Sequence, residues 1–302
     1  MRSLRKAFAL ALLILLTSSA LPQAVCPPPG PTTDSFTLNS RVDEVWLSFT
    51  VRNRLGNAVR NLTLGDFSLS TDGQPVTRIT QFYPLDDLPL RLAVLLDVSD
   101  SMRAQALAGQ WAAAEFLARI IRPGKDEASL AFFSVDTHVL HPGQLPAVGD
   151  INDHQVGQTA LYDALYEYVQ KLATAPGTSP ARRVVLALTD GEDNWSRHSL
   201  ADIIRLAQQA DVRIYPVTAH SPRLQFAGDS GLRQLAEATG GRAFVLRRYA
   251  DLNKTFPLDE EELHSGYVIA FRPPAAACGF HNLRLGLRHR AWRVQARSGY
   301  YD

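Results

Sequence analysis

The sequence is poor in cysteine and methionine, and it has no long apolar run beyond its first 20 residues. Its only cysteines are Cys26 and Cys278, which excludes a cysteine-rich scaffold and a four-cysteine zinc site. Charge is also nearly balanced, with 31 basic and 30 acidic side chains and a formal net charge of +1. This balance argues against nucleic acid or an anionic membrane as the main partner. Since 46% of the 302 residues are hydrophobic, we expect a packed globular protein with one large or two medium domains.

The N-terminus has the pattern of a secretory signal peptide. A short basic region, MRSLRK, precedes the apolar run AFALALLILL, and the small residues that follow predict cleavage after Ala20 or Ala24. We therefore assign residues 1–24 to a signal peptide. An uncleaved anchor helix is the alternative, although the run is shorter than the roughly 20 apolar residues that cross a bilayer. A lipid anchor on Cys26 fits poorly with the residues PQAV before it. We expect a secreted, periplasmic or cell-envelope protein with no membrane span after cleavage.

Two segments with the pattern of antiparallel strands flank the centre of the chain. After a Pro-rich linker at 25–34, apolar and polar residues alternate over 35–84, interrupted by turn sequences such as TDGQP. The alternation returns over 266–302. Because each set alone would leave an apolar face in water, we expect both to pack into one β-sandwich. A disulfide between Cys26 and Cys278 would suit this closure, but the sequence leaves two separate thiols open.

Residues 88–265 alternate buried strands with helices. Continuous apolar runs such as LAVLLD and VVLAL are typical of strands that are buried on both faces. Helices of ten or more residues separate them, which predicts right-handed crossovers and a doubly wound, mostly parallel sheet. The expected fold class is thus α/β, Rossmann-like, with this domain inserted into the sandwich. The helix predicted over 103–121 has an apolar stripe that we expect to face the core, made of Leu107, Trp111, Ala114, Phe116, Leu117 and Ile120.

Oxygen-bearing side chains gather where two of these strands end. Asp97 ends the first strand and Asp190 ends the third, so both should reach the carboxyl edge of the sheet. Ser99 and Ser101 follow Asp97, and Thr159 precedes a helix from which its hydroxyl can point to the same edge. Two adjacent carboxylates are electrostatically costly without a bound cation. Five oxygen donors without His or Cys suit Mg²⁺, with Mn²⁺ or Ca²⁺ as alternatives.

These five residues resemble the metal-ion-dependent adhesion site (MIDAS) of the von Willebrand factor type A (VWFA) domain, an Asp-x-Ser-x-Ser sequence with a distant Thr and Asp. Flanking stretches such as LTDGEDNWSRHSL and LAEATGGRAF are similar to an exported bacterial VWFA-related family. The resemblance implies that Ser99, Ser101 and often Thr159 bind the ion directly. It also implies that Asp97 and Asp190 act through water, and that an Asp or Glu of a protein partner completes the coordination. The implied function is adhesion or another metal-dependent protein contact. The sequence has no Gly-x-Ser-x-Gly motif and no other nucleophile and base constellation, which argues against an enzyme.

Four residues near the site have a second interpretation or depart from the family pattern. Asp100 stands where relatives often have glycine, and it is either a solvated loop acid or an acid that strengthens cation capture. Glu192 and Asp193 are expected to support the site or a helix N-terminus without binding the ion. Relatives can move their last helix, but Pro257 predicts a kink or break in that helix here.

Two further functions stay open. The protein could be an envelope scaffold whose ion only stabilises the loops. It could also be a metal-assisted hydrolase, for which His198 is the candidate general base. The remaining motifs carry weaker signals: His138 and His141 lie on an expected hairpin without a third zinc ligand, and the Asn-x-Ser/Thr triplets are interpreted as chance (Asn61, Asn194 and Asn253).

Overall fold

The computed structural model describes residues 44–140, 158–175, 180–219, 228–251, 263–273 and 279–301. The predicted signal peptide and linker, both cysteines, His141, Asn253 and the segment around Pro257 lie outside these residues. None of the helices in the described part of the chain is long and apolar enough to cross a membrane.

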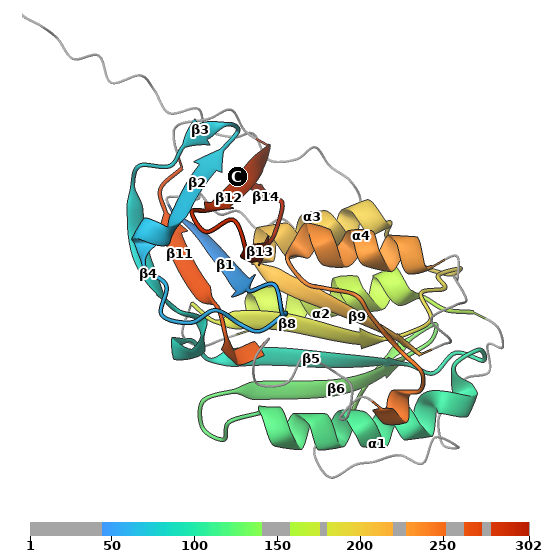
Figure 1. The fold of residues 1–302 in the computed structure, drawn as a ribbon. Coiled ribbons are helices and arrows are strands. Elements are labelled where there is room, and N and C mark those ends of the chain that lie inside the picture. The colour runs from blue at the N-terminus through green and yellow to red at the C-terminus, as the bar shows by residue number, and fades with distance from the viewer. Residues whose placement is uncertain are drawn as a thin grey trace, which may run out of the picture.

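The centre of the molecule is a six-stranded sheet in the order β10-β9-β8-β5-β6-β7 (Figure 1). Its strands are β5 (Leu90–Asp97), β6 (Glu127–Phe133), β7 (Thr137–Leu140), β8 (Arg182–Leu188), β9 (Val212–Ala219) and β10 (Phe244–Leu246). Five of them are parallel, and β7 turns back on β6 as the expected hairpin, with His138 opposite Phe132. β5 is buried at every position because it lies in the middle of the sheet with helices on both faces. The predicted α/β class is confirmed.

Four helices cover the two faces of this sheet: α1 (Arg103–Ile120), α2 (Leu161–Thr174), α3 (Leu200–Ala210) and α4 (Asp229–Thr239). Side chains of α1 pack on one face together with Tyr249, which lies in a short 3₁₀ helix at Tyr249–Asp251. The other three helices pack on the opposite face, as their separate positions in Figure 1 show. Each face therefore has its own apolar core.

The prediction that the apolar stripe of α1 faces the core is partly wrong. Phe116 and Ile120 are buried as expected, but Leu107 and Trp111 are 51% and 60% exposed. The buried face consists largely of small residues, including Ala106 and Ala113, because the helix approaches the sheet closely. At Gly109, for example, an added Cβ would lie 2.9 Å from Leu96 Cδ1.

The remaining strands form two antiparallel sheets, as predicted, and each sheet combines strands from both ends of the chain (Figure 1). One has the order β13-β1-β11-β4 and the other β14-β12-β2-β3. Their bounds are β1 (Val45–Arg52), β2 (Phe67–Thr71), β3 (Gln74–Pro75), β4 (Ile79–Pro84), β11 (Tyr267–Phe271), β12 (Phe280–Leu287), β13 (Arg293–Ala296) and β14 (Gly299–Tyr301), with short 3₁₀ helices at Leu64–Asp66 and Leu85–Asp87. Phe49, Phe67 and Tyr267 contact one another in the apolar core between the sheets.

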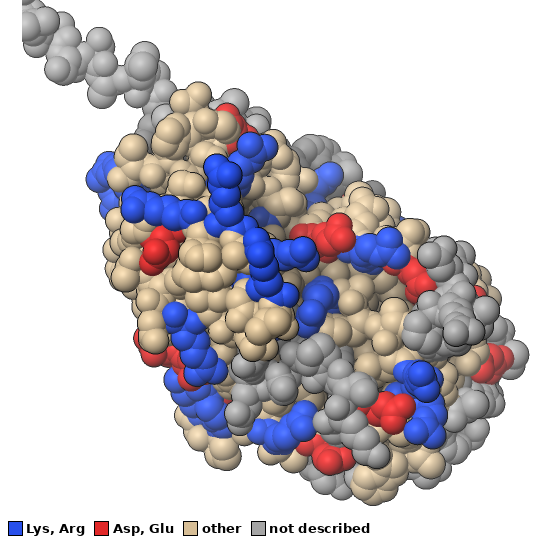
Figure 2. All heavy atoms as spheres, in the orientation of Figure 1, with Lys and Arg blue, Asp and Glu red and all other residues tan. Residues whose placement is uncertain are grey.

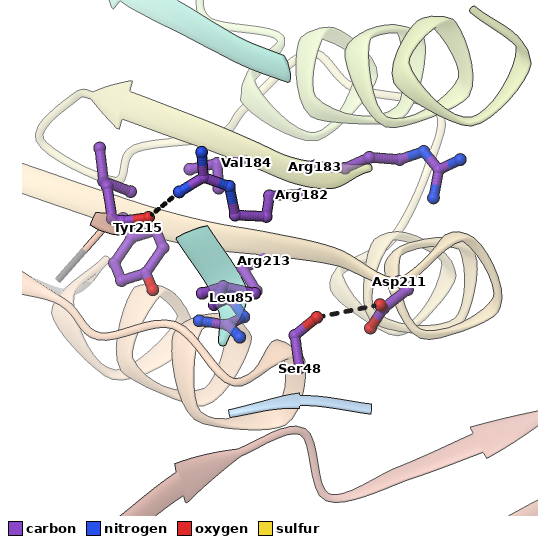
Figure 3. Close-up of a pocket in the computed structure, with 9 residues that line it drawn as sticks. Ser48, Leu85, Arg182, Arg183, Val184, Asp211, Arg213 and Tyr215 are labelled. Carbon is purple, nitrogen blue, oxygen red and sulfur yellow. Dashed lines mark hydrogen bonds between the residues drawn. The ribbon is translucent and has the colours of Figure 1, made fainter. Parts of the chain in front are cut away.

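Polar side chains connect this sandwich to the α/β domain. Buried Arg297 donates to the backbone carbonyls of Gln208 on α3 and Trp46 on β1, and its Nε lies 3.6 Å from the carboxylate of Asp211. Ser48 Oγ donates to Asp211 Oδ2 at 3.4 Å across the same seam (Figure 3). A small cavity of about 10 Å³ beside them is lined partly by arginines, so polar contacts and not only apolar packing join the two domains.

Candidate metal centre

Asp97 lies at the carboxyl end of the central strand β5 and has no exposed surface. Its Oδ1 accepts a hydrogen bond from the Ser99 N–H at 2.9 Å, and its Oδ2 accepts one from Thr189 Oγ1 at 2.7 Å. Burial, helped by the negative charge of Asp190, raises the pKa of Asp97 to about 6 although these hydrogen bonds oppose the rise. The ionised carboxylate is thus held in a place where a cation would stabilise it.

The two serines follow directly in the loop between β5 and α1. Ser99 is buried and Ser101 is exposed, and their hydroxyl oxygens lie 3.2 Å apart. The Ser99 carbonyl accepts a hydrogen bond from the Met102 N–H at 2.9 Å, which forms a turn that leads into α1. Half-buried Asp100 lies between the serines in the chain. The turn therefore places two hydroxyl groups beside each other next to the carboxylate of Asp97.

Asp190 lies just beyond β8, the strand that pairs with β5. Its side chain is half-buried, and its Oδ1 accepts a hydrogen bond from the Glu192 N–H at 3.1 Å. Both Asp97 and Asp190 also raise the pKa of buried Tyr249, second to the effect of burial itself. The two carboxylates are thus close enough to repel each other, as the sequence predicted from the position of their strands.

Thr159 is buried in the loop before α2 and is attached to the loop that follows Asp190. Its backbone N–H donates to Asn194 Oδ1 at 2.8 Å. Its carbonyl accepts hydrogen bonds from the backbone N–H groups of Asn194 at 3.0 Å and Trp195 at 3.1 Å. The next residue, Ala160, donates its N–H to the carbonyl of Ser134, beyond β6. The Thr159 loop is therefore fixed to two neighbouring loops at the carboxyl edge of the sheet.

The loop after Asp190 also caps the N-terminus of α2. Asp193 Oδ1 accepts hydrogen bonds from the Tyr162 N–H at 3.3 Å and from the Ser196 hydroxyl. Ser196 Oγ in turn accepts one from the Asp163 N–H at 3.0 Å. Asp193 thus satisfies one backbone donor in the first turn of α2 and holds the serine that satisfies a second, the helix N-terminal role expected for it.

His198 is held against α2. Its Nδ1 lies 2.6 Å from Asp163 Oδ1, and its ring stacks on Tyr166 with 3.8 Å between the ring centroids. The Asp163 carboxylate also accepts hydrogen bonds from the backbone N–H groups of Arg197 and His198. The ring therefore joins the loop to the helix.

The structure thus places the predicted ligands on three loops at one edge of the sheet, and ion binding by them stays a prediction. Sequence reasoning did not find Thr189, Asn194 or Tyr249, which hold or surround these ligands. A triplet around Asn194 was noted, but only as a chance glycosylation pattern. Its contact with Thr159 joins loops 35 residues apart, and no local pattern reports such a contact.

The donor set fits a hard divalent cation. Within the described residues, no group of three or more His, Cys, Asp or Glu side chains converges as a metal site. The five candidate ligands are a different kind of group from such a cluster, because they combine two carboxylates with three hydroxyls. Such oxygen donors suit Mg²⁺, Mn²⁺ or Ca²⁺ better than a softer metal. A cation would also offset the cost of the buried carboxylate of Asp97 beside Asp190.

The chain belongs to the von Willebrand factor type A domain family, whose match covers residues 92–257, more than half of the sequence. The resemblance seen in the sequence is therefore confirmed. No curated protein matches the sequence.

Several solved structures are similar in fold. Proximal thread matrix protein 1 of the mussel byssus is 17% identical, with a TM-score of 0.45, and the match covers 62% of this chain and 49% of that one. Another structure of that protein has zinc in its MIDAS motif. The ArnB paralog VWA2 of Sulfolobus acidocaldarius (14% identical, TM-score 0.43) matches over 85% of this chain and 76% of its own. Manganese-loaded TRAP protein of Plasmodium vivax (14%, TM-score 0.42) matches over 77% and 98%. The chain spans about half the length of the mussel protein.

Proposed function

We propose that this protein is an exported, non-enzymatic VWFA module that binds an acidic residue of a protein partner through a divalent cation, with Mg²⁺ the favoured ion. The proposed ligands are Asp97, Ser99, Ser101, Thr159 and Asp190. When bound, the cation would supply an electrophilic position for a carboxylate of the partner. The observation that carries the proposal is the buried Asp97 carboxylate beside Asp190, next to two serine hydroxyls 3.2 Å apart.

Residues around the ligands support this function by fixing their positions. Thr189 holds one oxygen of Asp97, and the N–H of Ser99 holds the other. Asn194 holds the backbone of Thr159. Neutral hydroxyls among the ligands would leave much of the charge of the cation uncompensated, which favours an anionic ligand from outside. Exposed Ser101 lies on the side that an external carboxylate could approach.

A scaffold whose ion only stabilises the loops is less well supported. The Thr159 loop is already attached to the Asn194 loop by three hydrogen bonds that need no ion. Removing a cation would therefore leave these loops connected. In the binding function, the cation provides a contact with a carboxylate of the partner, which the protein cannot make without the ion.

Calorimetric titration with Mg²⁺ tests the metal site. We expect Ser101→Ala and Thr159→Ala to remain folded and to bind Mg²⁺ more weakly than the unaltered protein. Ser68→Ala, at an exposed serine on β2 of the sandwich, is the matched control and should keep the original affinity. Unchanged affinity in both ligand variants would exclude the proposed site.

Capture from a cell-envelope extract tests the partner. The protein is immobilised and incubated with extract in Mg²⁺ or in EDTA, alongside the Thr159→Ala variant. We expect a bound protein that is lost with EDTA and with Thr159→Ala, and that is released by free glutamate-rich peptide. A bound protein that stays in EDTA, together with a large chelator effect on melting temperature, would favour the scaffold function instead.

A further inference from the structure

A groove of about 770 Å³ lies between the two domains, and none of its described lining residues is one of the five candidate ligands. One wall is formed by α4 and β10 of the α/β domain, and the other by the ends of β1 and β13 of the sandwich. Its volume is in the range of ligand-binding sites, which often lie at domain boundaries. Nothing in the proposed metal-dependent contact uses this groove.

The groove is strongly basic. Its described lining includes five arginines (Arg52, Arg54, Arg233, Arg242 and Arg293) and only two acidic residues, Asp229 and Glu237. This is an excess of three positive charges in a protein whose formal net charge is +1. Figure 2 shows basic side chains gathered on the face that carries the ends of β1 and β13. Such a concentration of one sign attracts an anionic ligand.

The arginines come from both walls. Arg54 and Arg293 lie on the sandwich side and Arg233 lies on α4, and all three are exposed. The Arg242 guanidinium lies 4.4 Å from the ring centroid of Phe244, a contact that orients it over the aromatic face. Guanidinium groups bind carboxylates through two parallel hydrogen bonds, so arginines in this position suit aspartate and glutamate side chains.

Two sheet edges also border the groove. Among the strands that the structure describes, β10 pairs only with β9 and β13 only with β1. The middle residue of β10, Val245, is 47% exposed and lines the groove. A strand at a sheet edge offers backbone N–H and C=O groups in alternation, which only another polypeptide backbone can match. This favours a protein segment over a sulfated sugar or a nucleic acid as the occupant.

We infer that the groove binds an extended acidic segment of a partner protein, with its carboxylates on the arginines and its backbone along β10. This contact does not require a metal ion. The α4 end of the groove lies next to the loop that follows Asp190, because a Cβ added to Gly191 would lie 2.8 Å from Leu232 Cδ1. A partner that reaches the metal edge could thus continue into the groove.

Binding of a defined peptide in EDTA tests this inference apart from the metal site. The probe is a fluorescein-labelled twelve-residue peptide of alternating Glu and Thr, and the same peptide with Gln for Glu is its control. We expect the Glu peptide to bind more tightly than the Gln peptide, with an affinity that falls as salt is raised. Thr159→Ala should bind the Glu peptide normally, so failure of the metal proposal would not affect this result.

Variants locate the binding site. We expect Arg54→Glu/Arg293→Glu to weaken binding of the Glu peptide by about tenfold or more, because like charges replace complementary ones. The matched control is Arg284→Glu/Arg290→Glu, which reverses two exposed arginines outside the groove and should change affinity less than about twofold. Arg233→Gln, a milder change on the α4 wall, should give a smaller loss even if the double reversal fails to fold.

Three results would overturn the inference. One is equal binding of the Glu and Gln peptides, and another is an equal loss in the groove and control variants. The third is binding of heparin, but not of the Glu peptide, that depends on Arg54 and Arg293. That outcome would assign the groove to a sulfated polysaccharide.

Discussion

Asn194 holds Thr159 at both of its backbone hydrogen-bonding groups. The side-chain Oδ1 of Asn194 accepts the Thr159 N–H at 2.8 Å, and the Asn194 N–H donates to the Thr159 carbonyl at 3.0 Å. A residue of the loop after β8 therefore determines the position of a candidate ligand in the loop before α2. The site depends on this pairing as well as on the ligands themselves.

Asn194→Ala should weaken Mg²⁺ binding without unfolding the protein. The Thr159 N–H would lose its acceptor, and loss of a residue that orients a ligand typically costs roughly 10- to 100-fold in metal affinity. Asn194→Asp is the matched variant, since it keeps an acceptor oxygen and should retain more of the affinity than the alanine variant. Calorimetric titration with Mg²⁺ measures both. Equal, unchanged affinities in the two variants would show that the pairing does not position Thr159.

Asp126 should make stability depend on pH in the acid range. Its side chain is fully buried, and burial raises its pKa. Hydrogen bonds from Arg122 and from the backbone N–H of Leu90 outweigh this effect and bring the pKa down to about 2. A carboxylate with a lowered pKa stabilises the folded state above its unfolded pKa of about 4, here by about 2 kcal/mol, and this contribution is lost as pH falls towards 2.

Urea unfolding at several pH values measures this contribution. Asp126→Asn should be less stable than the unaltered protein at pH 7, and the difference should shrink as pH falls from about 4 towards 2. Exposed Asp136→Asn is the control and should follow the unaltered protein throughout. A difference that stays constant with pH would mean that packing, and not the carboxylate charge, is responsible.

Tyr267→Phe should destabilise the sandwich. Buried Tyr267 Oη accepts the Leu62 N–H at 3.0 Å and donates to the Val59 carbonyl at 3.1 Å. Removing the hydroxyl leaves both backbone groups without this partner, at a cost of about 1–3 kcal/mol. Thermal and urea unfolding measure the loss. Tyr83→Phe, at a half-buried tyrosine, is the control for removing a hydroxyl and should cost less.

The exposed apolar residues of α1 should contribute little to stability. Replacing Trp111 with Lys should change the free energy of unfolding by no more than about 0.5 kcal/mol, because the side chain is 60% exposed. Phe116→Ala on the buried face should cost about 3–5 kcal/mol. Urea unfolding of the two variants compares the faces directly. A large loss for Trp111→Lys would mean that this face is covered in the folded protein.

The positions of Asp97 and Asp190 could be predicted because the carboxyl ends of parallel strands meet at one edge, whatever the details of packing. Thr159 was expected at the same edge for another reason, namely that it lies just before a helix. Asn194 and Tyr249 could not be predicted, since they reach the site through contacts between distant segments. The prediction of the buried face of α1 was partly wrong for a local reason. Most sides of this helix carry apolar or small residues, so the periodicity of the sequence does not show whether Trp111 or Ala113 faces the core.

The position of β1 has a consequence for how the protein folds. β1 pairs with β11 on one side and with β13 on the other, so both of its neighbours lie more than 200 residues later in the chain. During synthesis β1 must wait until β11 (Tyr267–Phe271) and β13 (Arg293–Ala296) have emerged, whereas the last strand of the central sheet, β10, ends earlier, at Leu246. We therefore expect the central sheet to form first and closure of the two ends to be the late, slow step, as is usual for contacts of high sequence separation.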